Sequence, residues 1–333
     1  MLIIIFLLFV IFSIILAIIA NFKNSPQFTG GSTIDKIENK KLLYSRKNKE
    51  IMDKINEQSF PYVYKTLNEP EIMFKRLCES KLVIKNNVLF RTYPEEYYSS
   101  DRIADHYTEE LRMRAVFLPG RKVSPYDYWL SHKNADYEEI YQKSGVANGF
   151  NPAIARYLCE KFGAKSVFDP CMGWGDRLIG CMAAGVKKYV GYDTNIKLEE
   201  KYVEISKLAP IEVEFNMRPI ESGPFEYSEF DLVITSPPFF TIEIYEGEFT
   251  STTLYKTEKE WYNTFYRLLI DRCIKAVKSG GHLCFYIAPQ MLDYSKKFMS
   301  EFGATYVGTV GFYQDAGKAF DQNKVRNTYI WSM

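Results

Sequence analysis

Histidine and paired cysteines are almost absent from this sequence. The 333 residues contain three histidines and six cysteines, and no two cysteines form a C-x-x-C pair. Because structural zinc sites are usually built from such ligands, we expect no metal site. The cysteines are scattered through apolar segments, which is typical of reduced, buried thiols in a reducing compartment.

The chain also lacks an excess of charge of either sign. Its 42 basic and 41 acidic residues leave a net charge of +1, so the whole molecule has no strong electrostatic attraction for nucleic acid. Any such attraction has to come from a local patch. Aromatic residues are frequent instead, at 16%. They can stack on bases, but filling the core is their more common use.

The N-terminal residues lack charge altogether. Leu2–Ala20 is apolar apart from Ser13, and a helix of this length spans roughly 28 Å, close to the hydrocarbon thickness of a bilayer. A cleaved signal peptide is the alternative, but no basic residue precedes the run and no Ala-x-Ala site follows it. We therefore expect a transmembrane anchor over residues 1–22.

Basic residues dominate the segment after this anchor. Eight lysines and arginines and four acids lie between Asn21 and Lys54, and the positive-inside tendency then keeps the bulk of the chain on the cytoplasmic side. Residues 23–59 are interpreted as a linker and juxtamembrane segment. Their lysines could contact lipid headgroups or nucleic acid, although a solvated helix face is the simpler interpretation.

Residues 60–148 are rich in tyrosine and charge and contain no repeat. Helix starts are indicated at Asp105 and at Ser124-Pro125, where serine can cap a helix and proline suits its first position. We expect a small, mostly helical accessory module that packs on the main domain. It is a candidate for substrate recognition.

Strands and helices alternate from residue 149 to the C-terminus. Strands are expected over 166–169, 188–193, 211–215, 231–235, 282–288 and 328–331. Helices are expected over 152–162, 177–184, 196–208 and from Trp261 to Val277, where Ser279-Gly280-Gly281 breaks the last one. This alternation predicts an α/β domain with a mostly parallel sheet and helices on both faces. Ligands bind such sheets at the carboxyl ends of the strands.

The first candidate site follows the first of these strands, in the stretch Asp169-Pro-Cys171-Met-Gly173-Trp174-Gly175-Asp176. Glycines let backbone amides approach a ligand closely, and the strand-end carboxylate of Asp169 can pair with a ligand ammonium group. Asp193 ends the next strand, twenty residues after Gly173. An acid at that place can accept both hydroxyls of a ribose.

A nicotinamide cofactor uses the same ribose contact, but its fingerprint is G-x-G-x-x-G. The third glycine is missing here, since position 178 is leucine and the next glycine is Gly180. Carboxylates at Asp169 and Asp176 would also repel a pyrophosphate. They suit a ligand with a cationic amino-acid end and no phosphate, which indicates S-adenosylmethionine.

The second candidate site, Ser236-Pro237-Pro238-Phe239, directly follows the buried strand 231–235. With the glycine loop, it resembles the (D/N/S)-P-P-(Y/F/W) signature of class I S-adenosylmethionine-dependent amino-methyltransferases of the DNA adenine-N6 and cytosine-N4 type, particularly members from phages and large DNA viruses. The resemblance extends from about residue 149 to the C-terminus. It implies a Rossmann-like, doubly wound fold with a seven-stranded sheet.

The resemblance also implies residue roles. Ser236, Pro237, Pro238 and Phe239 would be catalytic: the serine and the carbonyl after it accept hydrogen bonds from the target amino group, the prolines hold that carbonyl, and the aromatic ring stacks on the planar target. Phe240 is expected to pack toward the core. For Asn151, a simple helix cap is an equal interpretation. The implied cofactor-binding residues are Asn151, Asp169, Cys171, Gly173, Trp174, Gly175, Asp176, Asp193 and Ser236.

Two departures leave the target base open. Position 236 is serine rather than aspartate or asparagine, and Phe239 replaces the frequent tyrosine. We expect a membrane-anchored methyltransferase that acts on adenine N6 or cytosine N4, in DNA rather than RNA. A base inside a duplex would have to be flipped out. Recognition would fall to residues 60–146, to the loop 241–257 or to a partner protein, because no large recognition insertion is present.

Two alternatives stay open. One is a protein-glutamine methyltransferase with the same site. The other is a membrane-anchored structural protein, such as a virion scaffold, that keeps the fold after losing turnover. Intact cofactor and target motifs favour the enzyme over the scaffold.

Overall fold

The computed structural model describes residues 70–90, 103–108, 116–117, 125–136, 139–140, 143–144, 149–223, 225, 229–240, 242, 244–245, 249–313 and 322–333. The predicted membrane anchor and the basic segment 23–59 lie outside these residues. Within the described ranges, no helix is both long enough and apolar enough to cross a membrane.

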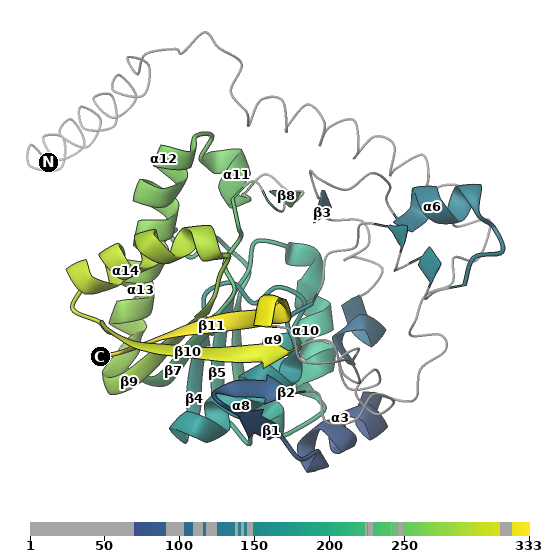
Figure 1. Cartoon of the computed structure of the whole chain (residues 1–333), viewed down its shortest axis with the longest axis horizontal. Helices are drawn as coiled ribbons and strands as arrows, with labels where there is room; N and C mark the ends of the chain where they lie inside the picture. The colour runs from purple at the N-terminus through teal and green to yellow at the C-terminus, as the bar shows by residue number, and fades with distance from the viewer. Residues whose placement is uncertain are drawn as a thin grey trace, which may run out of the picture.

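A nine-stranded sheet forms the centre of the described structure, in the order β1-β2-β10-β11-β9-β7-β4-β5-β6 (Figure 1). Its strands are β1 (Val83–Lys85), β2 (Val88–Phe90), β4 (Ser166–Asp169), β5 (Lys188–Tyr192), β6 (Glu212–Asn216), β7 (Phe230–Thr235), β9 (Val277–Tyr286), β10 (Thr305–Tyr313) and β11 (Val325–Ser332). Five adjacent strands of this sheet run parallel to one another, namely β9, β7, β4, β5 and β6. Strand β11 runs antiparallel to both of its neighbours, β10 and β9. A separate pair, β3 (Val116–Phe117) and β8 (Ile244–Tyr245), is antiparallel.

The strand order reverses at β4. From β4 the chain moves outward to β5 and β6, and then returns to place β7 on the other side of β4. Crevices for ligands open at such a reversal, outside the carboxyl ends of the strands. The predicted Rossmann-like, doubly wound arrangement is therefore confirmed.

The predicted number of seven strands is wrong. The additional pair is the β1–β2 hairpin, which comes from the region expected to be a mostly helical accessory module. Strand β2 pairs in parallel with β10, with Val88 opposite Gly311. Asn86 and Asn87 form the tight hairpin turn, both with positive φ, a conformation that asparagine tolerates better than most residues. The hairpin thus extends the main sheet rather than forming a separate unit.

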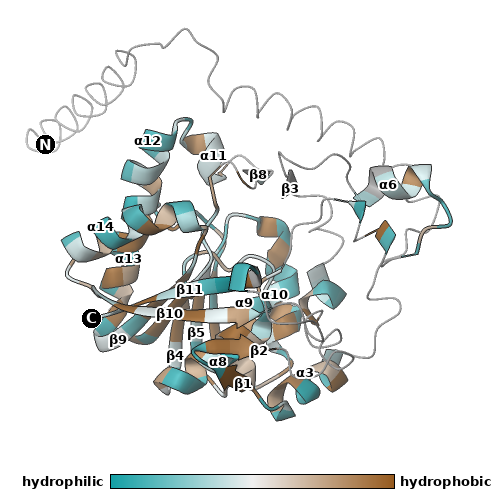
Figure 2. Ribbon diagram, viewed as in Figure 1, coloured by the Kyte–Doolittle hydropathy of each residue, from teal (hydrophilic) through white to brown (hydrophobic). Residues whose placement is uncertain are grey.

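Two layers of helices cover the sheet. One face packs against α3 (Pro70–Glu79), α8 (Pro152–Phe162), α9 (Asp176–Ala183) and α10 (Glu199–Ser206). The other packs against η3 (Trp261–Tyr266), α13 (Arg267–Ala276) and α14 (Leu292–Glu301). Strand β7 serves both layers, because Leu232 and Ile234 belong to the first core and Val233 to the second. Figure 2 shows the hydrophobic strands between more hydrophilic outer helix faces.

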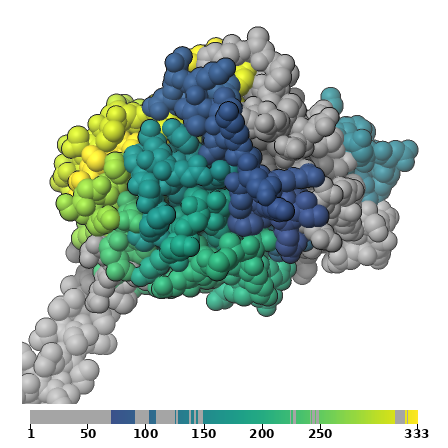
Figure 3. Space-filling view, turned by 90° about the horizontal axis from the view of Figure 1, so that it is seen from below, coloured from purple at the N-terminus to yellow at the C-terminus, as the bar shows by residue number. Residues whose placement is uncertain are grey.

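Short elements complete the described fold. They are α6 (Pro125–Ser131), η2 (Ile196–Leu198), α11 (Ser251–Leu254), α12 (Glu258–Glu260), η4 (Pro289–Met291), η5 (Gln322–Lys324) and a helix over 103–108. The helix predicted at Pro125 is thereby confirmed. Figure 3 shows α3 and the β1–β2 hairpin, in dark blue, against the teal part of the main domain. Arg156 of α8 fixes this contact by donating hydrogen bonds to the carbonyl oxygens of Leu77 and Ser80.

The helix predicted from Trp261 to Val277 ends differently from the prediction. Helix α13 stops at Ala276, and Ser279-Gly280-Gly281 lies within β9 rather than between a helix and a strand. The register with β7 shifts there, between the Phe230–Val277 and Leu232–His282 pairs. A Cβ on Gly281 would lie 2.9 Å from the carbonyl oxygen of Asp231. The glycine therefore permits a bulge pressed against the neighbouring strand.

Candidate functional site

The loop between β4 and α9 turns twice through left-handed backbone conformations. Gly173 has φ +60° and Gly175 has φ +93°, which residues with a side chain rarely adopt. A Cβ on Gly175 would also lie 2.7 Å from Cδ1 of Ile205 on α10. The backbone N–H of Met172 donates to the carbonyl of Tyr192 at 2.8 Å, so the loop is tied to the end of β5.

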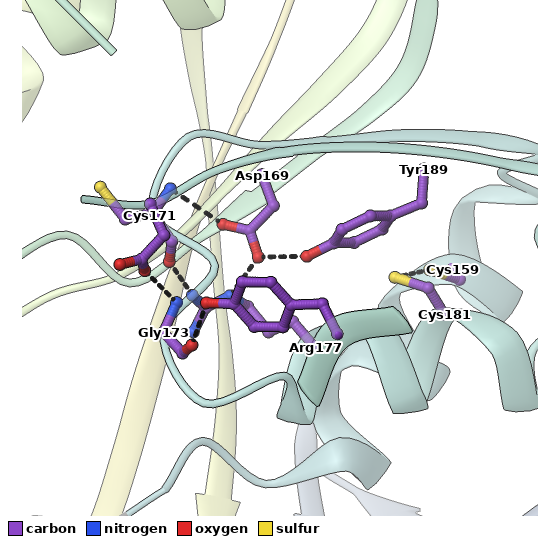
Figure 4. A network of polar contacts seen from close by, with 9 residues as sticks. Cys159, Asp169, Cys171, Gly173, Arg177, Cys181 and Tyr189 are labelled. Carbon is purple, nitrogen blue, oxygen red and sulfur yellow. Dashed lines mark hydrogen bonds and ion pairs between the residues drawn. The ribbon is translucent and has the colours of Figure 1, made fainter. Parts of the chain in front are cut away.

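Asp169 ends β4 at the start of this loop and is fully buried. Figure 4 shows its carboxylate in contact with Cys171, Arg177 and Tyr189. Its Oδ2 accepts hydrogen bonds from Nε of Arg177 at 2.7 Å and from the hydroxyl of Tyr189 at 2.8 Å, while its Oδ1 accepts from the N–H of Cys171 at 3.2 Å. Arg177 also donates to the carbonyl of Cys171. Burial, with the negative charge of Asp169, raises the pKa of Tyr189 well above its ordinary value, so the phenol remains a donor.

Asp169 was expected to pair with a ligand ammonium group. In the structure its carboxylate accepts three hydrogen bonds from the protein, which tie the loop to α9 and β5, and Asp169 is not part of the cavity lining. The sequence does not reveal the hydrogen bond from Tyr189, because Tyr189 lies twenty residues from Asp169 in the chain.

Asp193 follows β5 and is half-buried. Its Oδ2 accepts the N–H of Gly173 and its Oδ1 accepts the N–H of Asn195, both at 2.8 Å. Burial raises the pKa of Asp193 above its ordinary value, against the opposing effect of these two hydrogen bonds. Each carboxylate oxygen has two acceptor positions. These two bonds fix the orientation of the Asp193 carboxylate, which keeps acceptor capacity for a ligand donor.

Asn151 caps α8 at the edge of the site. Its Oδ1 accepts the N–H of Ala153 at 2.8 Å, as the helix-cap interpretation expected. Its Nδ2 is buried and has no hydrogen-bond acceptor among the described residues. Helix α8 also packs tightly on α9, because a Cβ on Gly180 would collide with the carbonyl oxygen of Pro152. The side chain of Asn151 is therefore held through Oδ1, and both N–H donors of its Nδ2 are unused by the described residues.

Ser236-Pro237-Pro238-Phe239 lies at the end of β7. Pro237 is buried, while Ser236, Pro238 and Phe239 are partly exposed. The ring centroids of Phe239 and Tyr286 are 6.4 Å apart. Phe240 has φ +51° and its ring centroid lies 5.6 Å from that of Trp261. The turn at Phe240 thus directs two consecutive aromatic rings to different surroundings.

A cavity of about 290 Å³ joins the two candidate sites. Its wall includes Gly173 and Asp193 from the first and Ser236 and Phe239 from the second. The strand order places Asp193 after β5, Gly173 after β4, Ser236 after β7 and Tyr286 at the end of β9. The cavity therefore follows the carboxyl edge of the sheet across the strand reversal.

Most of the predicted residues meet in this cavity. Those that line it are Cys171, Gly173, Trp174, Asp176, Asp193, Ser236, Pro238 and Phe239. Four others support the wall without being part of the lining, namely Asn151, Asp169, Gly175 and Pro237. The cofactor-loop residues and the Ser-Pro-Pro-Phe residues thus converge.

Several lining residues were not singled out from the sequence. They are chiefly Thr194, Asn195, Arg218, Glu221, Phe249 and Tyr286. The rule that ligands gather at strand ends could have found Tyr286 and the residues after β5. Burial raises the pKa of Glu221, whose Oε1 accepts a hydrogen bond from the hydroxyl of Tyr255 at 3.3 Å.

Metal ligands do not gather in the part of the chain that the structure describes, where no group of three or more His, Cys, Asp or Glu side chains could hold an ion. The six cysteines are free. Cys159 and Cys181 approach each other between α8 and α9, with 3.7 Å between their sulfur atoms.

Comparison with known proteins gives similarities of structure alone. No family model and no curated protein matches the chain. Among solved structures, TrmN from Thermus thermophilus has a TM-score of 0.39 and 16% identity, with 54% of this chain and 48% of that chain covered. A methyltransferase from Pyrococcus furiosus has a TM-score of 0.39 and 15% identity, covering 54% and 81%. The ribosomal protein L11 methylase from Lactobacillus delbrueckii subsp. bulgaricus has a TM-score of 0.35 and 13% identity, covering 54% and 76%.

These TM-scores are below 0.5 and the identities are at most 16%. Such similarities decide neither the cofactor nor the substrate of this chain. Both have to be inferred from the residues of the site.

Proposed function

We propose that this chain is an S-adenosylmethionine-dependent methyltransferase that acts on the exocyclic amino group of a nucleic-acid base. The observation that carries the proposal is the shared cavity: Gly173 and Asp193 line one part of it, and Ser236 and Phe239 line another. These residues lie far apart in the sequence. A glycine loop and a Pro-Pro turn with purely structural roles would not need to line the same cavity.

The residues of the first part fit this cofactor. The carboxylate of Asp193 faces the cavity and is oriented by two backbone amides, as a ribose diol requires. The unused, buried Nδ2 of Asn151 is a donor suited to a ligand carboxylate. Asp176, at the start of α9, adds a second carboxylate to the lining, which suits a cationic amino-acid end and disfavours a pyrophosphate.

The chain's own residues supply position rather than acid–base groups. When bound, S-adenosylmethionine supplies a methyl group activated by the sulfonium. In this proposal the hydroxyl of Ser236 and the carbonyl of Pro237 accept hydrogen bonds from the target amino group, and Phe239 stacks on the ring. Pro237 and Pro238 have fixed φ angles, so that carbonyl is held in place. Holding two reactants in a productive geometry accounts for much of the acceleration in such transfers.

The proposed target is adenine N6 or cytosine N4, in DNA in preference to RNA. In a duplex both amino groups are paired, so the base would be taken from single strands or flipped out. We also propose that Leu2–Ala20, outside the described residues, anchors the enzyme in a membrane with its catalytic domain on the cytoplasmic side.

Titration calorimetry of the purified full-length chain with S-adenosylmethionine tests the cofactor assignment. Asp193→Ala should weaken binding of the cofactor and of its demethylated product at least tenfold, because hydrogen bonds to a charged group contribute about 1.5–3 kcal/mol each. Glu212→Ala is the matched control, because this acid is exposed at the start of β6. Equal affinities in the two variants would remove the ribose assignment. Preferential binding of a nicotinamide cofactor would overturn the proposal.

A further inference from the structure

Arg326 lies on the opposite side of the target site from the acids of the cavity. Strand β11 runs antiparallel to β9 with Thr328 opposite Tyr286, so Arg326, two residues earlier, lies beyond the carboxyl end of β9. Asp193 and Glu221 instead follow β5 and β6, on the other side of β7. Neighbouring strands are about 4.8 Å apart, so β11, which carries Arg326, lies two spacings or roughly 10 Å from β7, which precedes Ser236.

Three arginines line the cavity, and protein groups engage two of them. Arg177 is buried and paired with Asp169. Arg218 donates to the carbonyl of Ser222 and lies over the ring of Tyr192, 5.1 Å from its centroid. Arg326, by contrast, is exposed. No described residue forms a side-chain hydrogen bond or an ion pair with its guanidinium group.

We infer that Arg326 binds the backbone phosphate of the substrate, next to the base that lies against Phe239. The inference rests on the proposed function and adds a contact with the phosphate backbone of the substrate, a contact that a protein glutamine could not provide. Tyr286 lines the cavity at the end of β9, the strand between β7 and β11.

The chemistry of the side chain supports an anionic ligand. Arginine stays charged at physiological pH and presents a planar fork that matches two oxygens of a phosphate. A glutamine side chain in a protein substrate is neutral and has no pair of charged oxygens for this fork. Because Arg326 is exposed, water and salt screen the contact, so it should contribute to affinity in a strongly salt-dependent way.

The test uses the full-length protein and a short, fluorescent single-stranded DNA, with affinity measured at several salt concentrations between about 50 and 200 mM. Arg326→Gln should weaken binding about three- to tenfold. It should also lower the slope of log K against log salt by about 0.7, the value for one phosphate contact on a single strand. Arg326→Lys should restore most of the slope. Affinity for S-adenosylmethionine should not change in either variant.

Arg76→Gln is the matched control, because it removes the same charge from an exposed position on α3. An Arg326→Gln slope equal to that of Arg76→Gln would overturn the inference and leave the methyltransferase proposal intact. Wild-type transfer to a glutamine peptide with no binding of the oligonucleotide would also overturn it. Wild-type protein that fails to bind S-adenosylmethionine would overturn the proposed function instead. An Arg326-dependent salt slope in that case would still establish an anion site.

Discussion

Replacing Phe239 by alanine removes a ring that lines the cavity beside Tyr286. If the target base stacks on this ring, its loss costs about 1–3 kcal/mol, which is roughly fivefold to more than a hundredfold in apparent affinity for the substrate. Affinity for S-adenosylmethionine should stay nearly unchanged, because the groups that would hold the cofactor follow β4 and β5. Phe239→Trp should keep part of the activity, since it retains an aromatic face.

Phe240 supplies the matched control, because it is the next residue in the chain. Its ring packs against Trp261 at 5.6 Å between centroids and is partly buried against the core on the α13 face. Phe240→Ala should therefore cost about 1–2 kcal/mol of stability for a partly buried ring and lower the melting temperature by about 2–8 °C. Its substrate preference should change less than that of Phe239→Ala.

The assay is transfer of a labelled methyl group to single-stranded DNA, duplex DNA and RNA, with thermal unfolding of each variant measured in parallel. Transfer by Phe239→Ala at the wild-type rate would refute the stacking role and move the target site elsewhere. A larger loss of transfer in Phe240→Ala than in Phe239→Ala would show that the two rings have been assigned the wrong way round.

Three further predictions concern packing, pH and location. Gly180→Ala should destabilise the fold by about 1–3 kcal/mol, because the new Cβ collides with the carbonyl of Pro152; an unchanged midpoint of urea unfolding would contradict this. For Asp231, burial alone would raise the pKa, but hydrogen bonds from Lys278 and from two backbone amides lower it to about 2. The ionised carboxylate therefore stabilises the fold above about pH 4. The stability difference between wild type and Asp231→Asn, about 1 kcal/mol for this partly exposed pair, should disappear as the pH falls toward 2; a difference that persists there in urea titrations would disprove the assignment. Finally, a Leu2–Ala20 anchor should keep the full-length protein in the membrane fraction after alkaline carbonate washing, whereas release or a mature N-terminus near Asn21 would exclude it.

Much of the fold could be predicted because the central strands carry a strong local signal. Strand β4 lies over the predicted residues Ser166–Asp169, and β7 extends the predicted strand by one residue, to Phe230. Buried parallel strands read as continuous apolar runs, so their positions follow from composition alone. The β1–β2 hairpin has no such signal. It is two strands of three residues each, and only the distant edge of β10 makes them part of the sheet.

The convergence of several candidate residues could also be predicted, because it follows from their places at strand ends. Gly173, Asp193 and Ser236 lie at strand ends, and topology brings strand ends together. The role of Asp169 could not be predicted in this way, because it depends on Arg177 and Tyr189 occupying its carboxylate. The sequence identifies a carboxylate at a strand end, but tertiary packing determines which side chains donate hydrogen bonds to it.

In the proposed function, one cavity brings an activated methyl group and a base amino group together. The measurement that tests it most directly is mass spectrometry of nucleosides after the full-length protein has been incubated with S-adenosylmethionine and single-stranded DNA. We expect a methyl group on adenine N6 or cytosine N4, at a level that falls sharply in Phe239→Ala. Tight binding of S-adenosylmethionine, with no methyl transfer to DNA, RNA or protein, would contradict the claim and favour a structural protein that has kept the fold.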